Sequence, residues 1–444
     1  MNQPPFAPPL APPFAPPFAP DAKFSPYWWD DVPRPMLPAA ELPRTVDVAI
    51  VGSGYTGLHA ALQTARGGRQ TVVFDAEDAG FGCSTRNGGQ ISTSIKPSFE
   101  ALARRHGPQK AQDILAEGQR SLAWTGEFIR AEAIDCNFGV VGRFHAAHNA
   151  AQFEALARRV ADQPQGPAVE AEVVTRAEQR REIGSDAYYG GVIYTKHASL
   201  HPARYHRGIL ERAMAAGAQV IARCPVTAIV RDGARFRVTT ARGVVEARDV
   251  VVATNAYTGA LLPWLQRRVI PIGSYIIATE PLPEKVIDTL IPRNRIVSDT
   301  RKVVFYYRAS PDRRRILFGG RVSHDETDPA VSGPLLHADL AKLFPELASV
   351  RISHSWCGFV AYTFDELMRV GRHDGMHYAM GYCGSGVGMA GYLGMRVGQQ
   401  VLGLAEGRTA FDDLPFPTRP LYRGNPWFLA PSIRYYRWRD RLPI

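Results

Sequence analysis

The hydrophobic pattern of the chain changes its period twice between residues 46 and 74. Residues 46–51 are apolar except for Asp47, a pattern typical of a strand buried on both faces. Residues 55–67 carry apolar side chains at a helical spacing, and residues 71–74 are again a short apolar run. This order predicts a strand, a helix and a second strand parallel to the first.

Other patterns follow further along the chain. Helical spacing recurs at 110–131 and 150–160, and an apolar helical stretch covers 389–402. Residues 270–349 instead alternate as strands do, most clearly in "SYIIATE", "KVVFYYR" and "RILFGGR". The chain therefore combines an α/β pattern with a region of alternating strands.

Both ends of the chain differ from the rest. Residues 1–40 begin with repeated Pro-Pro-Phe units, which favour extended polyproline II, so we expect a proline-rich arm that is flexible or lies along the surface. A docking segment for a proline-binding partner is the alternative. Residues 411–444 form an aromatic and basic tail, for which packing on the body of the protein, a dimer contact and a shallow membrane contact all remain open.

Length and composition narrow the class of protein. With 444 residues, 45% hydrophobic and 21% charged, the chain can form two domains with packed interiors. No run approaches the roughly 18 apolar residues of a membrane-spanning helix. The net charge of +10 comes from scattered residues, so it favours small anionic ligands and disfavours nucleic acid. Five cysteines without a Cys-x-x-Cys pair fit a reducing compartment, so we expect a cytoplasmic protein without a metal site.

Three glycines lie where the first strand gives way to the helix. Gly52, Gly54 and Gly57 form G-x-G-x-x-G, in which the glycines allow a tight turn, a close pyrophosphate and close helix packing. The helix N-terminus adds unpaired N–H groups and a positive dipole. Asp75 follows Gly57 by 18 residues, where a carboxylate can accept hydrogen bonds from ribose hydroxyls. The segment predicts dinucleotide binding and leaves NAD and FAD open.

Seven stretches, in order over residues 46–405, carry a family resemblance. They are "VGSGYTGL", "GFGCSTRNGGQ", "VVATNAYTG", "SYIIATEPL", "FGGR", "SWCGFVAYTFDELMRVG" and "GYCGSGVGMAGYLG". Together they resemble the D-amino-acid oxidase superfamily of flavoproteins, and within it the γ-glutamylputrescine oxidase-like branch. The resemblance implies an α/β plus α+β fold, with a Rossmann-like FAD-binding domain and an antiparallel-sheet substrate domain over the flavin. Both domains are discontinuous, with residues 44–98, 198–265 and 350–410 in the first and residues 99–197 and 266–349 in the second.

The resemblance also implies which residues contact FAD. The first glycine loop would hold the pyrophosphate, Asp75 the ribose and Val226 the adenine, while a second glycine loop at 384–389 would place a helix N-terminus at the flavin. The implied cofactor-binding residues are Gly52, Ser53, Gly54, Tyr55, Thr56, Gly57, Asp75, Ser84, Thr85, Arg86, Asn87, Gly88, Gly89, Gln90, Val226, Thr254, Asn255, Gly384, Ser385, Gly386, Val387, Gly388 and Met389.

Substrate contacts follow from the same resemblance, in which aromatic side chains and a cation surround the reacting carbon. The candidates are Tyr257, Tyr275, Tyr306, Tyr307, Arg321, Trp356 and Tyr362. Each tyrosine also fits ordinary packing in the sheet. Arg321 fits an ion pair with Asp299 or Asp325 as well as contact with an anionic substrate.

The implied reaction is oxidation of the C–N bond of an amine or amino acid, with a γ-glutamylputrescine-like, carboxylate-bearing amine favoured. Hydride transfer to flavin N5 would give an imine that hydrolyses to a carbonyl, and O₂ would reoxidise the flavin with formation of H₂O₂. No side-chain base is expected, because burial can lower the pKa of the amine itself. Gly358 and Asn87 stand near the positions where relatives carry a Cys or His bonded to the flavin, so noncovalent FAD is expected.

Two alternatives remain open from the sequence. The first is a dehydrogenase of N-methyl or D-amino acids that passes electrons to a quinone or carrier. It is kept because residues 315–321 lack the lysine that sarcosine oxidases use with O₂. The second is a non-catalytic flavin-binding scaffold that recruits partners through the proline-rich arm.

Overall fold

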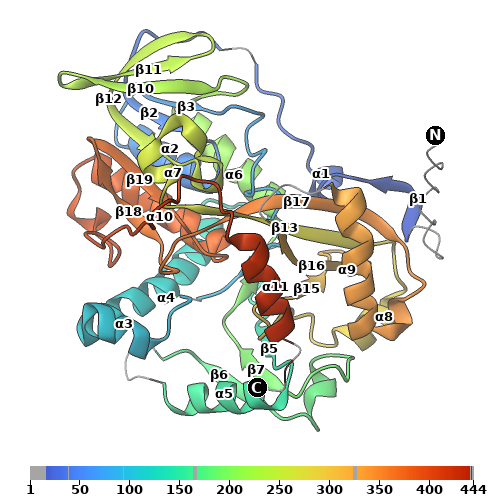
Figure 1. Cartoon of the computed structure of the whole chain (residues 1–444). Coiled ribbons are helices and arrows are strands. Elements are labelled where there is room, and N and C mark those ends of the chain that lie inside the picture. Colours follow the sequence, from blue (N-terminus) through green and yellow to red (C-terminus); the bar gives the residue numbers. More distant parts are fainter. Residues whose placement is uncertain are drawn as a thin grey trace, which may run out of the picture.

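The computed structural model describes residues 17–38, 40–93, 95–163, 168–323, 328–440 and 442. Two large sheets organise the chain, one built around parallel strands and the other mainly antiparallel, with helices packed against them (Figure 1). The expected α/β plus α+β fold is confirmed. Residues 1–16 of the predicted proline-rich arm lie outside the described residues.

The parallel sheet contains the predicted strand–helix–strand unit. Strands β2 (Thr45–Val51) and β3 (Thr71–Phe74) pair in parallel and are connected by α2 (Tyr55–Arg66). The strand order is β10-β11-β12-β2-β3-β9, with β19 parallel to β12 and antiparallel to β18. The remaining bounds are β9 (Gln219–Ile221), β10 (Val226–Asp232), β11 (Arg235–Thr240), β12 (Gly243–Val252), β18 (Arg369–His373) and β19 (Met376–Met380). The carboxyl ends of β2, β3 and β12 meet at one edge, where ligands bind in doubly wound folds.

Side chains of β2 pack in two apolar cores. Val48 and Ile50 pack in the core that includes α2, α6 (Pro202–Ala215) and α10 (Gly386–Val401). Val46 and Ala49 pack in a second core with residues of β11 and β12. Because successive strand residues point to opposite faces, the continuous apolar run at 48–51 matches a strand that is covered on both sides.

The second sheet has the order β1-β17-β13-β16-β15-β14-β5-β7-β6. Its bounds are β1 (Phe18–Lys23), β5 (Arg143–Ala146), β6 (Ala171–Val174), β7 (Gly191–Tyr194), β13 (Ile270–Thr279), β14 (Ile296–Asp299), β15 (Tyr306–Ala309), β16 (Ile316–Ser323) and β17 (Ile352–Tyr362). A separate small sheet pairs β4 (Gln90–Ile91) with β8 (Ala198–Ser199). The other helices are α1 (Trp28–Asp31), α3 (Phe99–His106), α4 (Pro108–Ala131), α5 (Ala150–Ala161), α7 (Pro263–Gln266), α8 (Glu284–Leu290), α9 (Pro329–Leu343) and α11 (Leu429–Arg439).

The predicted division into domains differs from the structure in two places. Strand β17, which the sequence placed with the FAD-binding segment 350–410, pairs with β13 and so belongs to the second sheet. Helices α3 and α4 lie in segment 99–197, yet Leu102, Ala111 and Ile114 pack in the core shared with α2 and α10. Local periodicity predicts a strand or a helix but does not select the distant element on which it packs.

Residues 17–38 of the predicted arm are part of the folded body. Strand β1 pairs in parallel with β17 at the edge of the second sheet. Trp28 is fully buried, and its Nε1 donates a hydrogen bond of 2.8 Å to the carbonyl oxygen of Asn87. This segment therefore supports the loop around Asn87. Across the described ranges, no helix combines the length and the apolar character needed to cross a bilayer.

Candidate active site

A large cavity lies at the carboxyl edge of the parallel sheet and extends along the second sheet. Its volume is about 1650 Å³, and its lining includes the start of α2, residues 80–90, β13, β17 and the start of α10. Sites for one drug-sized molecule usually measure about 300–1,000 Å³. The cavity therefore has room for an extended dinucleotide together with a small molecule.

The first glycine loop forms one wall of this cavity. Gly52 has a φ of +104°, a backbone conformation that favours glycine. A Cβ on Gly57 would lie 1.8 Å from the carbonyl oxygen of Gly52, so only glycine lets α2 approach the strand this closely. Helix α2 begins at Tyr55 and has no side-chain cap, which leaves N–H groups of its first turn available to an anion. This geometry suits the binding of a pyrophosphate.

Asp75 lies at the end of β3 and lines the cavity beside this loop. Its Oδ2 accepts hydrogen bonds from Ser53 N at 2.8 Å and Ser53 Oγ at 2.5 Å, and Oδ1 accepts one from Glu77 N at 3.0 Å. Burial raises the pKa of Asp75, and the hydrogen bonds from Ser53 oppose this rise. His206 supports the same loop from below, since its Nε2–H donates to Ser53 O at 2.8 Å.

Residues 83–90 form a part of the wall that adjoins the glycine loop. Ser84 Oγ accepts a hydrogen bond of 3.0 Å from Tyr55 N, which fixes this loop to the start of α2. The Asn87 amide donates to the carbonyl oxygens of Cys83 and Ser84, at 3.0 and 3.1 Å. Arg86 Nε donates to Phe81 O at 2.7 Å and its NH1 donates to Cys357 O at 3.1 Å. The loop is therefore held in shape by its own side chains.

Most of the predicted cofactor residues line the cavity. Those that do are Gly52, Gly54, Tyr55, Thr56, Asp75, Ser84, Arg86, Asn87, Gly88, Gln90, Val226, Thr254, Asn255, Gly384, Ser385, Gly386 and Val387. The remaining predicted residues lie behind this lining, and they are Ser53, Gly57, Thr85, Gly89, Gly388 and Met389. Thr85 shows why: its hydroxyl donates to Gly80 O at 2.7 Å and accepts from Trp29 Nε1 at 3.0 Å, so it faces the interior of the protein.

The seven substrate candidates separate into three groups. Tyr257, Tyr306 and Tyr362 line the cavity. Tyr275, Tyr307 and Trp356 are buried in apolar cores instead. Tyr306 and Tyr307 are neighbours on β15, so their side chains point to opposite faces and only one can reach the cavity. The backbone of Arg321 lies in β16, and its side chain lies outside the described residues.

One of the two ion-pair partners suggested for Arg321 already forms an ion pair with another residue. Asp299 forms an ion pair with Arg301, and burial raises the pKa of the Asp299 carboxyl to about 6. Asp325, the other suggested partner, lies outside the described residues.

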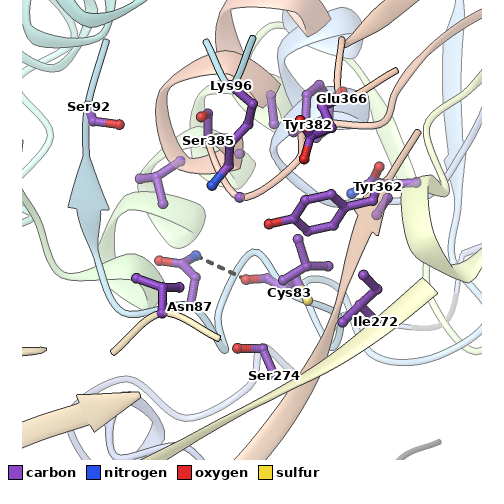
Figure 2. A pocket seen from close by; sticks show the side chains of 18 of the residues that line it. Cys83, Asn87, Ser92, Lys96, Ile272, Ser274, Tyr362, Glu366, Tyr382 and Ser385 are labelled. Atoms are coloured by element: carbon purple, nitrogen blue, oxygen red, sulfur yellow. Dashed lines mark hydrogen bonds between the residues drawn. The ribbon is translucent and has the colours of Figure 1, made fainter. Parts of the chain in front are cut away.

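A polar chamber, which sequence reasoning missed in part, lies between residues 83–90 and the start of α10. We define the chamber by Lys96, Ser274, Tyr306 and Tyr362, all of which line the cavity. Figure 2 shows Lys96 and Tyr362 pointing into this space from different segments, with Ser274 across from them. Ser274 Oγ lies 2.9 Å from Tyr306 Oη. A lone lysine among small polar residues in "QISTSIKPS" was the sequence signal for Lys96.

The phenols of the chamber are neutral at ordinary pH. Burial raises the pKa of Tyr306 to about 12, and burial also raises the pKa of Tyr362, an effect that the nearby Lys96 opposes. Neutral phenols donate one hydrogen bond each, so the chamber can orient a carbonyl, carboxylate or amine without supplying a base.

Fold and cavity together define an α/β dinucleotide-binding protein with a second sheet along the binding cavity. The chain belongs to the FAD dependent oxidoreductase family, whose sequence model matches residues 47–400. It is therefore an FAD-dependent oxidoreductase, and the resemblance to the D-amino-acid oxidase superfamily is confirmed.

Individual relatives cover nearly the whole chain. Gamma-glutamylputrescine oxidoreductase of Escherichia coli (strain K12) is 34% identical over 408 residues, which is 90% of this chain and 94% of that protein. The probable oxidoreductase OrdL of Rhizobium meliloti (strain 1021) is 31% identical over 427 residues, 92% of this chain and 95% of that protein. Among solved structures, glycine oxidase from Geobacillus kaustophilus superimposes with a TM-score of 0.71 at 20% identity, covering 85% of this chain and 99% of that chain. This last likeness supports the fold.

The residues present fit FAD, the cofactor of the family. The close approach of Gly57 to Gly52 leaves the uncapped start of α2 open to the pyrophosphate. Asp75 offers a buried carboxylate that can accept a hydrogen bond from a ribose hydroxyl. At the other end, α10 begins at Gly386 and directs its N-terminus at the cavity. A positive helix end suits the edge of the flavin that becomes anionic on reduction.

Proposed function

We propose that this enzyme oxidises the C–N bond of an amine or amino acid, and that its substrate is a carboxylate-bearing amine of the γ-glutamylputrescine type. One observation carries the proposal: the first glycine loop (residues 52–57), called the dinucleotide loop from here on, and the polar chamber open into the same cavity. A cofactor held at the loop would therefore reach a space suited to a small polar molecule. The name of the Escherichia coli relative supports the substrate class.

The proposed cofactor contacts follow the cavity from end to end. Gly52, Gly54 and the first turn of α2 would hold the pyrophosphate, and Asp75 would accept from a ribose hydroxyl. Asn87 and Gly88 on one side and the start of α10 on the other would enclose the flavin ring.

FAD, when bound, supplies a two-electron acceptor for the hydrogen on the carbon next to nitrogen, and O₂ then takes these electrons to give H₂O₂. The protein contributes position and desolvation. Chamber walls such as Tyr306 exclude water, which favours the neutral amine that can be oxidised. The resulting imine is hydrolysed to a carbonyl compound and a smaller amine. We assign no side-chain base.

The proposed attachment of FAD is noncovalent. Asn87 uses its amide within the loop, where its Oδ1 also accepts from Gly89 N at 2.8 Å. Gly358 has no side chain to form a bond. Denaturation in acid should release all yellow colour into the supernatant. Colour that stays with the precipitated protein would show a covalent bond.

Anaerobic mixing with candidate amines tests the function. A substrate should bleach the flavin absorbance near ~450 nm, and air should restore it with one H₂O₂ per turnover. If none of a panel of γ-glutamyl amines, N-methyl amino acids and D-amino acids bleaches the flavin, the proposal fails and a non-catalytic flavoprotein remains.

A second candidate is a dehydrogenase that passes electrons to a quinone or protein carrier. Helix α11 favours it, because Leu429, Ile433 and Tyr436 line the cavity while Trp427 and Trp438 are 64% and 57% exposed. Exposed aromatic residues beside a redox cavity suit contact with an acceptor or a membrane surface. Bleaching that is reversed by a quinone, without peroxide in air, would favour this candidate.

A further inference from the structure

Three cationic side chains line a part of the cavity away from the dinucleotide loop. We call Lys96, Arg143 and Arg159 the cation cluster. Lys96 follows β4, Arg143 begins β5 and Arg159 lies on α5, so the cluster joins three separate segments. None of the three belongs to the proposed FAD contacts, and Lys96, which is also part of the polar chamber, lies where the chamber meets the cluster.

The register of the second sheet explains why Arg143 faces the cavity. Arg143 pairs with Tyr194 on β7, and His145, two residues on, pairs with Ser298 on β14. All four residues line the cavity, because residues two apart on a strand share a face. The guanidinium of Arg143 lies 5.3 Å from the ring centre of Tyr194, which holds it in place.

Helix α5 presents Arg159 to the same space. Gln152, Leu156 and Arg159 line the cavity at helical spacing, while Arg158 points away from it. The cluster affects the pKa of His145. Burial lowers this pKa, and the charges of Arg143, Arg159 and Lys96 lower it further. All three members of the cluster therefore act on the same buried side chain.

Carboxylates also line this part of the cavity. Asp299 is already paired with Arg301. Glu100, Asp162 and Glu366 also line the cavity, and Glu100 is an exposed side chain within the field of Arg159. Within the described residues, neither Lys96 nor Arg159 has a carboxylate oxygen within 4.0 Å. Both side chains can therefore interact with an anion that enters the cavity.

We propose that the cation cluster is a subsite for a carboxylate at the end of the substrate remote from its reacting amine. The proposal rests on the proposed function and specifies its substrate class. A positive subsite attracts the carboxylate, so it holds that end of the substrate away from the flavin and lets the amine at the other end reach the ring.

The sheet sets the spacing between the two substrate ends. From Tyr306 on β15 to Arg143 on β5 there are two strand steps, through β14, or roughly 10 Å at about 4.8 Å each. The carboxylate of an α-amino acid is directly adjacent to its amine carbon and cannot span this interval. The subsite therefore selects long amines with a terminal carboxylate.

Steady-state kinetics with a matched substrate pair test the subsite. The pair is γ-glutamylputrescine and the same molecule with its carboxylate converted to a carboxamide. Wild-type kcat/KM should be at least about tenfold higher for the carboxylate, as expected for one charged hydrogen bond. Added salt should reduce this preference, because it screens the charges. Glycine should be a poor substrate.

Variants then assign the preference to the cluster. Arg159→Gln should lower kcat/KM for the carboxylate substrate by about tenfold and leave the carboxamide unchanged. Lys96→Gln combined with Arg159→Gln should remove the preference. Arg158→Gln, one residue away on α5 and outside the cavity lining, is the control and should behave as wild type. Glutarate, which has no amine, should bind wild type more tightly than the double variant in a calorimetric titration.

The outcomes separate the two proposals. Equal oxidation of both substrates by wild type would overturn the subsite and leave amine oxidation standing. A preference that survives the double variant would also overturn it. If no amine is oxidised at all, the proposed function fails, and the glutarate titration still decides whether the cluster binds carboxylate.

Discussion

Replacing Gly57 with alanine tests how closely α2 is packed at the dinucleotide loop. The added Cβ would lie 1.8 Å from Gly52 O and 3.3 Å from Ile50 Cγ2. Real Cβ atoms do not approach closer than 3.0 Å, so the loop and the helix must separate by about 1.2 Å at this point. Helix α2 cannot move away, because α10 packs against its other side. The backbone of α10 at Gly394 is so close to Thr56 that a Cβ on Gly394 would lie only 2.3 Å from Thr56 O.

The size of the effect follows from two opposing contributions. Overpacking of this kind costs about 1–3 kcal/mol, and backbone on both sides places this site at the upper end. Alanine recovers about 1 kcal/mol through its helix propensity. We expect the free energy of unfolding to fall by about 2 kcal/mol. Displaced N–H groups at the start of α2 should also weaken FAD binding by roughly 10- to 100-fold, as for one lost charged hydrogen bond.

The assay is a fluorescence titration of apoprotein with FAD, combined with urea unfolding with and without FAD. Gly139→Ala is the control, because its nearest neighbour would lie at an ordinary 3.6 Å and Gly139 does not line the cavity. If Gly57→Ala binds FAD within twofold of wild type and unfolds at the same urea concentration, the packing argument is refuted.

Three other predictions address the loop and its supports. Asp75→Asn should weaken FAD binding by about tenfold or more, because the carboxylate accepts two hydrogen bonds from Ser53 and would lose its charge. An unchanged FAD dissociation constant would contradict this expectation. Trp28→Ala should lower the free energy of unfolding by about 3–5 kcal/mol, since it leaves a cavity at a buried site and removes the hydrogen bond to Asn87 O. Urea unfolding measures this loss. A loss below about 1 kcal/mol would show that residues 17–38 are not part of the core. Burial lowers the pKa of His206 to about 4 from an ordinary 6.5, so between these pH values the unfolded chain binds a proton that the folded chain does not. His206 should therefore lower the free energy of unfolding by about 1.4 kcal/mol per pH unit as the pH drops from 6.5 to 4. The slope of this free energy against pH should be smaller by that amount in His206→Gln. Identical slopes in the two proteins would contradict the lowered pKa of His206.

The sequence predicted the parts of the fold that depend on neighbouring residues. The unit at 46–74 appears as β2, α2 and β3, and the helices at 110–131 and 150–160 appear as α4 and α5 within a few residues. These elements carry a clear period, and the glycine loop has a shape that its own glycines require. The alternating run at 302–308 was less reliable, because only its last residues enter β15.

The sequence by itself thus determined the dinucleotide loop, the carboxylate at Asp75 and the family, since all three are local patterns. Tertiary structure alone decided which side chains meet across the cavity. Tyr306 enters the chamber and Tyr307 enters the core because the strand alternates, and only the placement of the sheet shows which face is which. Lys96, Arg143 and Arg159 come together because sheet register and helix packing join segments that no local period relates.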